Sequence, residues 1–194
     1  MESRIIIGLG NPGRKYEATR HNLGFLVVQR LAKQFQVALS KNVIYQGILG
    51  QKTLGEKILQ FFLPLTFVNN SGEAVARLVK KKHFLGEHIL VVCDDLNLDF
   101  GQLRIKNGGS DGGHHGLESI IGSLGYDHFA RLRLGIGRPV SRDDIVDYVL
   151  SPFSKGEKQR LDIFIDEAVS CCQAWLLDSV EKVMNQFNKR KKDE

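Results

Sequence analysis

Residues 4–24 read RIIIGLGNPGRKYEATRHNLG and specify a strand, a turn and the start of a helix. The β-branched run Ile5–Ile7 is closed by glycines, which predicts a short buried strand. Glycines and Pro12 make Gly8–Gly13 a turn. From Asn22 to Phe35, apolar residues recur every four positions, which predicts a helix with one buried face. A strand that turns directly into a helix is typical of an α/β domain.

The remaining chain continues to alternate between strand and helix patterns. Strands are expected over 43–50, 57–63, 88–93, 100–106 and 130–137. Helices are expected after a Ser71 cap, after the glycine loop 107–116, from a capping box of Ser154 with Glu157, and near 180–187. The hairpin pattern of 43–63 makes the sheet mixed. We therefore expect an α/β fold, one domain over residues 1–188 with a mixed central β-sheet flanked by helices, followed by a basic C-terminal tail, 189–194.

The composition is that of an ordinary globular protein. The 194 residues are 42% hydrophobic and 25% charged, with a formal net charge of +5. This charge fits either a lysine-rich solvated surface or a polyanionic partner such as nucleic acid. Three cysteines, an odd number, form no disulfide framework and favour a cytoplasmic location. We expect no membrane partner, because apolar runs stay well short of the roughly 18 residues of a spanning helix.

The turn Gly8-Leu-Gly-Asn-Pro-Gly13 matches the dinucleotide-binding pattern G-x-G-x-x-G. Two features argue against that interpretation. Pro12 removes a backbone N–H from the turn that would hold a pyrophosphate. The pattern also requires an acidic residue about 20 positions later, and there is none between Glu17 and Glu56. A nicotinamide- or flavin-dependent oxidoreductase is therefore disfavoured.

Polar side chains collect where the predicted strands end. His21 stands just before a helix and close behind the glycine turn, where a neutral imidazole can act as a general base if a carboxylate orients it. Asp94 and Asp95 end the strand predicted over 88–93, and either can supply that carboxylate. Asn69 is not needed as a helix cap, so its amide is free to donate to a substrate oxyanion.

The loop 107–116 contains five glycines in ten residues and leads into a helix. It suits either phosphate binding at a helix N-terminus or a flexible connection. His114 and His115 are adjacent in the sequence and have no third ligand at metal-site spacing, so no metal site is predicted. Lys106, Arg131 and Arg133 flank the loop and form a candidate phosphate-backbone patch.

Together these segments resemble the bacterial-type peptidyl-tRNA hydrolase family. The matching stretches are GLGNPGRKYEATRHNLGF, PLTFVNNSGEAV, DDLNLDFGQLRIKNGGSDGGHHGL and RLRLGIGRP, which occur in the family's order over nearly the whole chain. The resemblance implies a monomeric, cofactor-free, cytoplasmic hydrolase with no obligate protein partner. Such an enzyme cleaves the ester that joins a peptide, or another N-blocked aminoacyl group, to the 3′ ribose of its tRNA, and so recycles tRNA from stalled peptidyl-tRNA.

The resemblance also implies roles for individual positions. His21 is similar to the family's catalytic base, and Asp94 to the carboxylate that orients it. Asn11 and Asn69 match the amides that hold the substrate and the tetrahedral intermediate. The matching substrate- and tRNA-binding positions are Tyr16, Phe67, Lys106, Arg133 and His115.

One position departs from the family pattern. The family usually reads GGHNG where this chain reads Gly112-Gly-His-His-Gly116, so His115 occupies the place of an asparagine. Imidazole donates one hydrogen bond and accepts another, which permits partial replacement of an amide. This departure leaves open an alternative function, a catalytically idle RNA-binding relative of the same fold.

Overall fold

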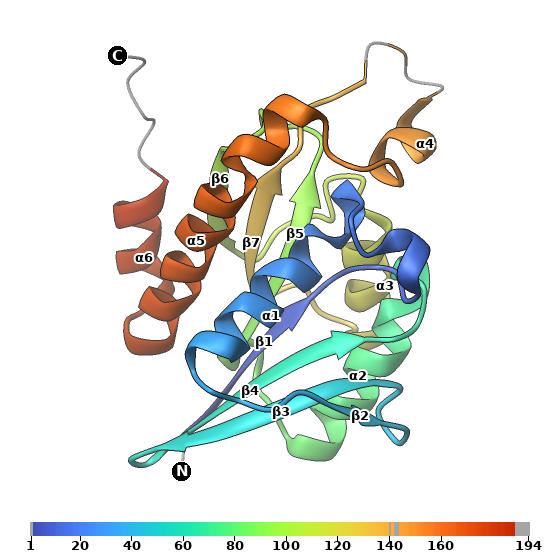
Figure 1. The fold of residues 1–194 in the computed structure, drawn as a ribbon. Helices are drawn as coiled ribbons and strands as arrows, with labels where there is room; N and C mark the ends of the chain where they lie inside the picture. The colour runs from blue at the N-terminus through green and yellow to red at the C-terminus, as the bar shows by residue number, and fades with distance from the viewer. Residues whose placement is uncertain (1, 140, 142–143, 189–194) are drawn as a thin grey trace.

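The computed structural model describes residues 2–139, 141 and 144–188. It contains a seven-stranded mixed sheet with the strand order β2-β3-β4-β1-β5-β7-β6 (Figure 1). The strands are β1 (Glu2–Gly8), β2 (Ser40–Asn42), β3 (Gly47–Leu54), β4 (Lys57–Pro64), β5 (Ile89–Asp95), β6 (Leu103–Asn107) and β7 (Ala130–Gly135). This confirms a single mixed α/β domain.

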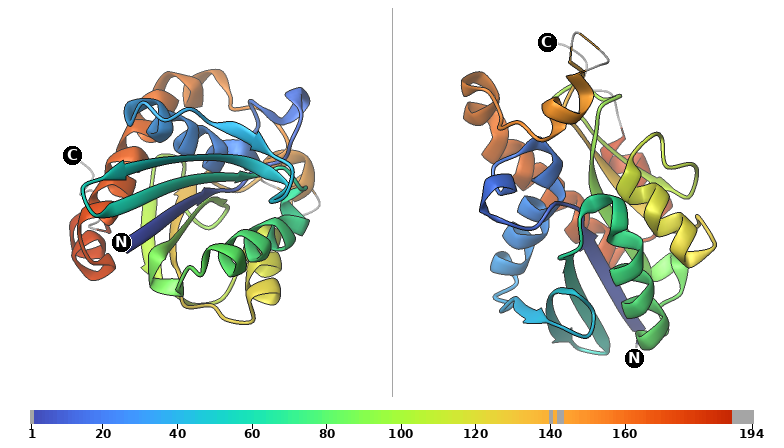
Figure 2. Two further views of the ribbon diagram at one scale, coloured as in Figure 1. Left: turned by 90° about the horizontal axis from the view of Figure 1, so that it is seen from below. Right: turned by 90° about the vertical axis from the view of Figure 1, so that its right-hand side faces the viewer.

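Helices cover both faces of the sheet, so that the domain has three layers (Figure 2). The α-helices are α1 (Leu23–Gln34), α2 (Ser71–Lys82), α3 (His115–Leu124), α4 (Ile145–Val149), α5 (Lys155–Leu177) and α6 (Val180–Phe187). Short 3₁₀ turns include η1 (Arg14–Tyr16), η2 (Arg20–Asn22), η3 (Val68–Asn70) and η4 (Gly86–His88). Helices α1, α5 and α6 pack on one face, and α2 and α3 pack on the other. None of the described helices is long and apolar enough to cross a membrane.

The pleat of the central strands divides the buried residues between two cores. In β5, Leu90 and Val92 pack toward α1 and α5, whereas Val91 and Cys93 pack toward α2 and α3. Successive side chains of a strand point to opposite faces, so a central strand covered by helices on both sides has to be apolar throughout. All seven residues of β5 are buried, including the two carboxylates at its end.

Strand direction determines where a site can form. The four central strands β4, β1, β5 and β7 are mutually parallel, while β2, β3 and β6 join the edges in antiparallel pairs. The carboxyl ends of the parallel strands therefore meet at one edge of the sheet. Ligand sites in open α/β sheets lie beyond this edge.

The glycines that follow β1 allow the strand and α1 to pack closely. A Cβ on Gly24 would lie 2.4 Å from the carbonyl oxygen of Val92, and a Cβ on Gly8 would lie 2.4 Å from the carbonyl oxygen of Gly24. Both positions exclude any larger residue, because the contact atoms belong to the backbone. Gly8 is thus explained by packing of the strand against the helix, without any phosphate ligand.

Several predicted boundaries require correction. Residues 43–46 form a turn between β2 and β3, because β2 is a three-residue edge strand too short to leave a pattern. Ser71 is the first residue of α2 and its hydroxyl caps nothing; Asn70 holds the N-cap position. The capping box of Ser154 with Glu157 is confirmed at the start of α5. The predicted basic tail, 189–194, lies outside the described residues.

Candidate active site

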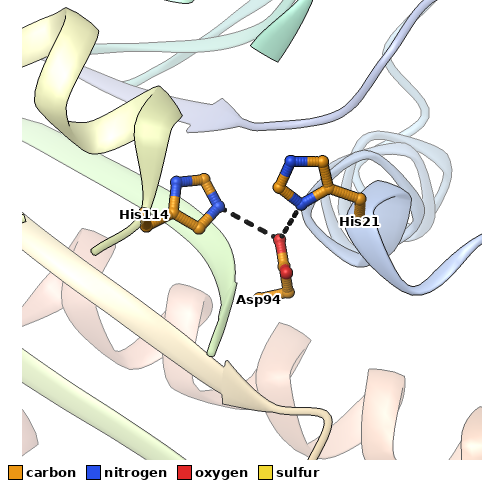
Figure 3. A group of neighbouring side chains, drawn as sticks. All are labelled: His21, Asp94 and His114. Carbon is orange, nitrogen blue, oxygen red and sulfur yellow. Dashed lines mark hydrogen bonds and ion pairs between the residues drawn. The ribbon is translucent and has the colours of Figure 1, made fainter. Parts of the chain in front are cut away.

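His21 and Asp94 form a hydrogen-bonded pair at the carboxyl edge of the sheet (Figure 3). The Nδ1 atom of His21 lies 2.8 Å from Oδ1 of Asp94. The side chain of Asp94 is 3% exposed and that of His21 is 15% exposed, so only the imidazole reaches the surface of the site. Because Nδ1 faces a carboxylate, it carries the proton, and Nε2 of His21 keeps its lone pair.

Strand alternation decides which of the two neighbouring aspartates pairs with His21. Asp94 follows Leu90 and Val92 on the face of the sheet that α1 covers, and the turn η2 places His21 just before that helix. Asp95 points to the opposite face, where its Oδ2 lies 2.9 Å from Nε of Arg133. Strand-end position alone left both carboxylates open, and the family resemblance favoured Asp94; in the structure Asp94 is the one that contacts His21.

The electrostatics of the pair suit a general base. Burial alone lowers the pKa of His21, but the charge and the hydrogen bond of Asp94 outweigh it, so the pKa is raised above the usual value of 6.5. Burial would raise the pKa of Asp94, yet His21 and His114 hold it far below its ordinary value. Asp94 therefore stays ionised, and its charge makes His21 a stronger base than a free imidazole.

His114 is a third member of the cluster, which the sequence did not predict. Its Nε2 lies 3.1 Å from Oδ1 of Asp94, the same oxygen that His21 contacts. Its Nδ1 accepts hydrogen bonds from the backbone N–H groups of Gly116 and Leu117, at 3.1 and 3.3 Å, as the N-cap of α3. An acceptor at Nδ1 requires the proton at Nε2, so His114 is a neutral donor to Asp94.

The same three side chains have the composition of a metal site. One ligand atom each from His21, Asp94 and His114 lies within 4.8 Å of the others. Sequence spacing missed this cluster because its members come from three separate segments. Metal binding through Nε2 of His114 would need a proton on Nδ1, which already faces two backbone N–H donors. The capping geometry therefore favours a hydrogen-bonded cluster over a resident metal ion.

Asn11 is buried in a network that fixes the orientation of its amide. Its backbone N–H donates to Oδ1 of Asn22 at 2.8 Å, and Nδ2 of Asn22 donates to the carbonyl of Asn11 at 3.0 Å. Its side-chain Oδ1 accepts the backbone N–H of Val68 at 2.9 Å. The Nδ2 group of Asn11 makes no hydrogen bond to any described residue, so its N–H groups are available to donate.

Three further residues expected to hold substrate lie on or next to the short turns η1 and η3: Tyr16, Phe67 and Asn69. Asn69 is exposed and directly follows Val68 in η3. Phe67 is 55% exposed, and its ring meets that of half-buried Tyr16 edge-on, with centroids 6.4 Å apart. These three residues and Asn11 are not among the residues that line the cavity beside His21, so the structure does not bring them into contact with the imidazole pair.

A cavity of about 490 Å³ opens beside the imidazole pair. It is lined by His21, Asp94 and His114 and by the apolar side chains Ile145, Val146 and Val149 of α4. Arg138 and His115 also face it. His21 therefore borders a space of the size that small ligands occupy, with one apolar wall and one polar wall.

Basic side chains gather on one face of the outermost strands. Lys106 and Arg133, both expected here, share this face with Arg104, which pairs with Arg133 across the two strands. Lys106 and Arg104 are exposed, and the side chain of Arg133 is 24% exposed. Arg104 was missed, although it alternates with Lys106 in the predicted strand.

Arg131 does not belong to this surface patch. It points to the same face as Arg133, but it is 1% exposed. Its guanidinium donates to the carbonyls of Gly109, Ser110 and Asp127. Arg131 therefore holds the glycine loop in place rather than meeting a phosphate.

His115 lies at the rim of the cavity, next to the cluster rather than within it. Its side chain is 77% exposed, and its Nδ1 lies 3.1 Å from Oε2 of Glu118, one turn along α3. His114 fills the N-cap position and makes the contact with Asp94. The departure from the family pattern at His115 therefore leaves the His21–Asp94 pair intact.

A histidine held by a buried carboxylate at the carboxyl edge of a parallel sheet is an arrangement typical of enzymes that use general-base catalysis. The family model described as "Peptidyl-tRNA hydrolase" matches residues 5–194. The chain belongs to this family.

Individual relatives agree with this assignment over nearly the full length. The chain is 43% identical to the peptidyl-tRNA hydrolase of Aquifex aeolicus over 196 residues, which covers 98% of each chain. It is 42% identical to that of Syntrophotalea carbinolica over 187 residues, covering 96% of this chain and 97% of the relative. The crystal structure of peptidyl-tRNA hydrolase from Acinetobacter baumannii superimposes with a TM-score of 0.90 at 36% identity, covering 95% of this chain and 94% of that one.

Proposed function

We propose that this chain hydrolyses the ester bond between a peptide, or another N-blocked aminoacyl group, and the 3′ ribose of tRNA. The observation that carries the proposal is the His21–Asp94 pair, whose free imidazole nitrogen borders a cavity at the carboxyl edge of the sheet. Membership of the peptidyl-tRNA hydrolase family supports the choice of substrate.

The geometry supports a general-base mechanism. Asp94 holds the Nδ1 proton of His21, and Nε2 takes a proton from water as the water oxygen attacks the ester carbonyl. The resulting tetrahedral oxyanion accepts hydrogen bonds from the amide of Asn11 or Asn69. Collapse breaks the bond to the ribose oxygen, which receives the proton from His21, releasing the free peptide acid and tRNA. Asp94 stays ionised and stabilises the imidazolium that forms in between.

The basic face formed by Arg104 and Lys106 of β6 and Arg133 of β7 supports the proposal that the substrate contains tRNA. Lys106, Arg104 and Arg133 lie beside the glycine loop that brings His114 to the site. We assign phosphate contacts to this surface and contacts with the acyl-bearing end to Tyr16 and Phe67. The protein works as a cytoplasmic monomer without a cofactor or an obligate protein partner.

The test is release of tRNA from an N-blocked aminoacyl-tRNA by wild type and by His21→Ala. Loss of the base should lower kcat by about 10²–10⁴-fold. Binding of deacylated tRNA should stay within about threefold, because the basic face is untouched. His128→Ala is the matched control, since the side chain of His128 is 82% exposed and does not line the cavity.

Two results would contradict the proposal. His21→Ala with near-normal turnover would remove the base from the mechanism. Wild-type protein that binds tRNA but releases nothing would instead indicate a catalytically idle RNA-binding relative. Comparison with unblocked aminoacyl-tRNA in the same assay measures how strongly a free amino group is rejected.

A further inference from the structure

Arg20, the residue before His21, is a buried charge outside the proposed chemistry. Its side chain is 8% exposed. One guanidinium nitrogen, Nη1, donates to the hydroxyl of Ser151 and to the carbonyl of Pro152, both at 2.7 Å. The other, Nη2, lies 2.7 Å from Oε2 of Glu157. A buried charge with this many aligned partners is costly to assemble, so its placement calls for an explanation.

The side-chain contacts of Arg20 come from one continuous stretch, residues 148–157, which runs from the end of α4 into the first turn of α5. Its guanidinium lies over the rings of Tyr148 and Phe153, with 4.3 and 5.4 Å to the centroids. The backbone N–H of Arg20 donates to the carbonyl of Ser151 at 3.1 Å, and Thr19 forms an isolated antiparallel bridge with Pro152. Side chain and backbone therefore attach η2 to this one segment.

The segment held by Arg20 continues into a wall of the cavity. Tyr148 is part of α4, whose neighbours Ile145, Val146 and Val149 line the cavity beside His21. The hydroxyl of Tyr148 donates to the carbonyl of Ile136 at 2.5 Å, which ties α4 to the end of β7. The guanidinium of Arg20 thus connects η2, which carries His21, to α4, which forms the apolar wall of the cavity.

Arginine suits this position better than lysine. Its planar fork donates in two directions at once and stacks on aromatic faces, whereas an ammonium is a compact point charge. Glu157 is itself held, because its Oε2 accepts the backbone N–H of Ser154 at 2.6 Å in the capping box of α5. The contacts of Arg20 therefore end on the first turn of a long helix packed in the core.

We propose that Arg20 is a positioning residue for the reaction. It fixes the position of His21 relative to the wall of the cavity that α4 forms. This inference rests on the proposed role of His21 as the base. Arg20 does not touch the substrate. It acts by keeping Nε2 of His21 at the distance from the cavity that attack by water requires. Small displacements of a catalytic group have large effects, with a shift of about 1 Å costing on the order of 10²-fold in rate.

The decisive comparison is Arg20→Gln against Arg30→Gln. Arg30 also joins a segment near the N-terminus to α5, through Asp162 at 2.6 Å and Asp166 at 2.7 Å, but it extends from α1 and lies away from η2. Each variant loses an ion pair between an arginine of the N-terminal region and a carboxylate of α5. Urea unfolding identifies conditions in which each variant is folded, and kcat is measured there at saturating substrate.

We expect Arg20→Gln to lower kcat by about 10–100-fold, with deacylated tRNA binding changed less than about threefold. Arg30→Gln should keep kcat within about twofold, because its ion pairs are solvent-exposed. The downfield proton NMR signal of the Nδ1–H of His21 provides a second measure. It should shift or broaden in Arg20→Gln and remain unchanged in Arg30→Gln.

A folded Arg20→Gln variant with normal kcat and an unchanged His21 signal would overturn the proposal. If that variant does not fold, Ser151→Ala removes one acceptor of the guanidinium, and Glu157→Gln removes the negative charge beside it while the Gln oxygen keeps the capping bond to Ser154. Each should lower kcat by about three- to tenfold; normal kcat in both would also overturn the proposal. Activity in His21→Ala would refute the base itself, whereas an inactive His21→Ala beside a fully active Arg20→Gln would refute only this inference.

Discussion

Replacing Asp94 by asparagine isolates the role of its charge. Both imidazoles contact the same oxygen, Oδ1, with His21 at 2.8 Å and His114 at 3.1 Å. An asparagine can keep its carbonyl oxygen in that place and accept both hydrogen bonds. The variant therefore retains the geometry of the cluster and removes the negative charge that faces the imidazolium formed during the reaction.

The size of the expected effect follows from that contact. A hydrogen bond to a charged group is worth about 1 kcal/mol more than a neutral one, and this is the smallest loss of transition-state stabilisation that we expect in Asp94→Asn. Two unit charges about 4 Å apart near a protein surface interact by about 4 kcal/mol, and this is the largest loss of transition-state stabilisation that we expect. With 1.36 kcal/mol per factor of ten, kcat should fall by about 5- to 10³-fold.

The pH profile gives the sign of the charge effect. His21 must be neutral to accept a proton, so activity is lost as pH falls through its pKa. Burial lowers that pKa, and the charge and hydrogen bond of Asp94 raise it by more. In Asp94→Asn the burial remains and the charge is gone, so the acid limb of kcat/KM should move to lower pH while the plateau falls.

The assay is hydrolysis of N-blocked aminoacyl-tRNA from pH 5 to 9, with Asp162→Asn as the control at an exposed carboxylate. His21 can be titrated in parallel by its ring-proton NMR signals. An Asp94→Asn variant with a wild-type plateau would refute the reasoning. An acid limb displaced to higher pH would do the same, because it would mean that the net effect of Asp94 on His21 is the reverse of the one described.

Three further predictions concern other parts of the site and its support. Asn11→Ala should lower kcat by about 10²–10³-fold with little change in tRNA binding, because the oxyanion loses a donor; an unchanged kcat would exclude that role. Lys106→Ala should weaken tRNA binding and reduce its salt slope by about one unit, whereas Lys41→Ala at the opposite edge of the sheet should do neither. Gly24→Ala should destabilise the fold by more than about 1 kcal/mol in urea unfolding, since its Cβ would meet a carbonyl oxygen at 2.4 Å, whereas Gly156→Ala has open space and should not.

Most of the fold could be predicted from local patterns. The Ile5–Ile7 run, the four-residue apolar repeat of α1 and the alternation of β7 each identified an element of the right type, since burial against one or two faces imposes those periods. The pattern failed where burial was weak. The three-residue edge strand β2 buries little, so nothing in its sequence separated it from the turn that follows.

The sequence alone determined the family and the residue types of the site. A long specific motif carries His21 and Asn11 within eleven residues, and the strand-end positions of Asp94 and Asn69 follow from simple apolar runs. The tertiary structure decided which side chains meet. The pleat of β5 turns Asp94, and not Asp95, toward the face that carries His21. The N-cap position of α3 places His114, and not His115, against Asp94. Arg131 is buried and therefore does not belong to the exposed basic face of β6 and β7. Each choice depends on where one segment stands relative to another. His21 and Asp94 are 73 positions apart and Asp94 and His114 are 20 apart, and contacts at such separations leave no local period in the chain.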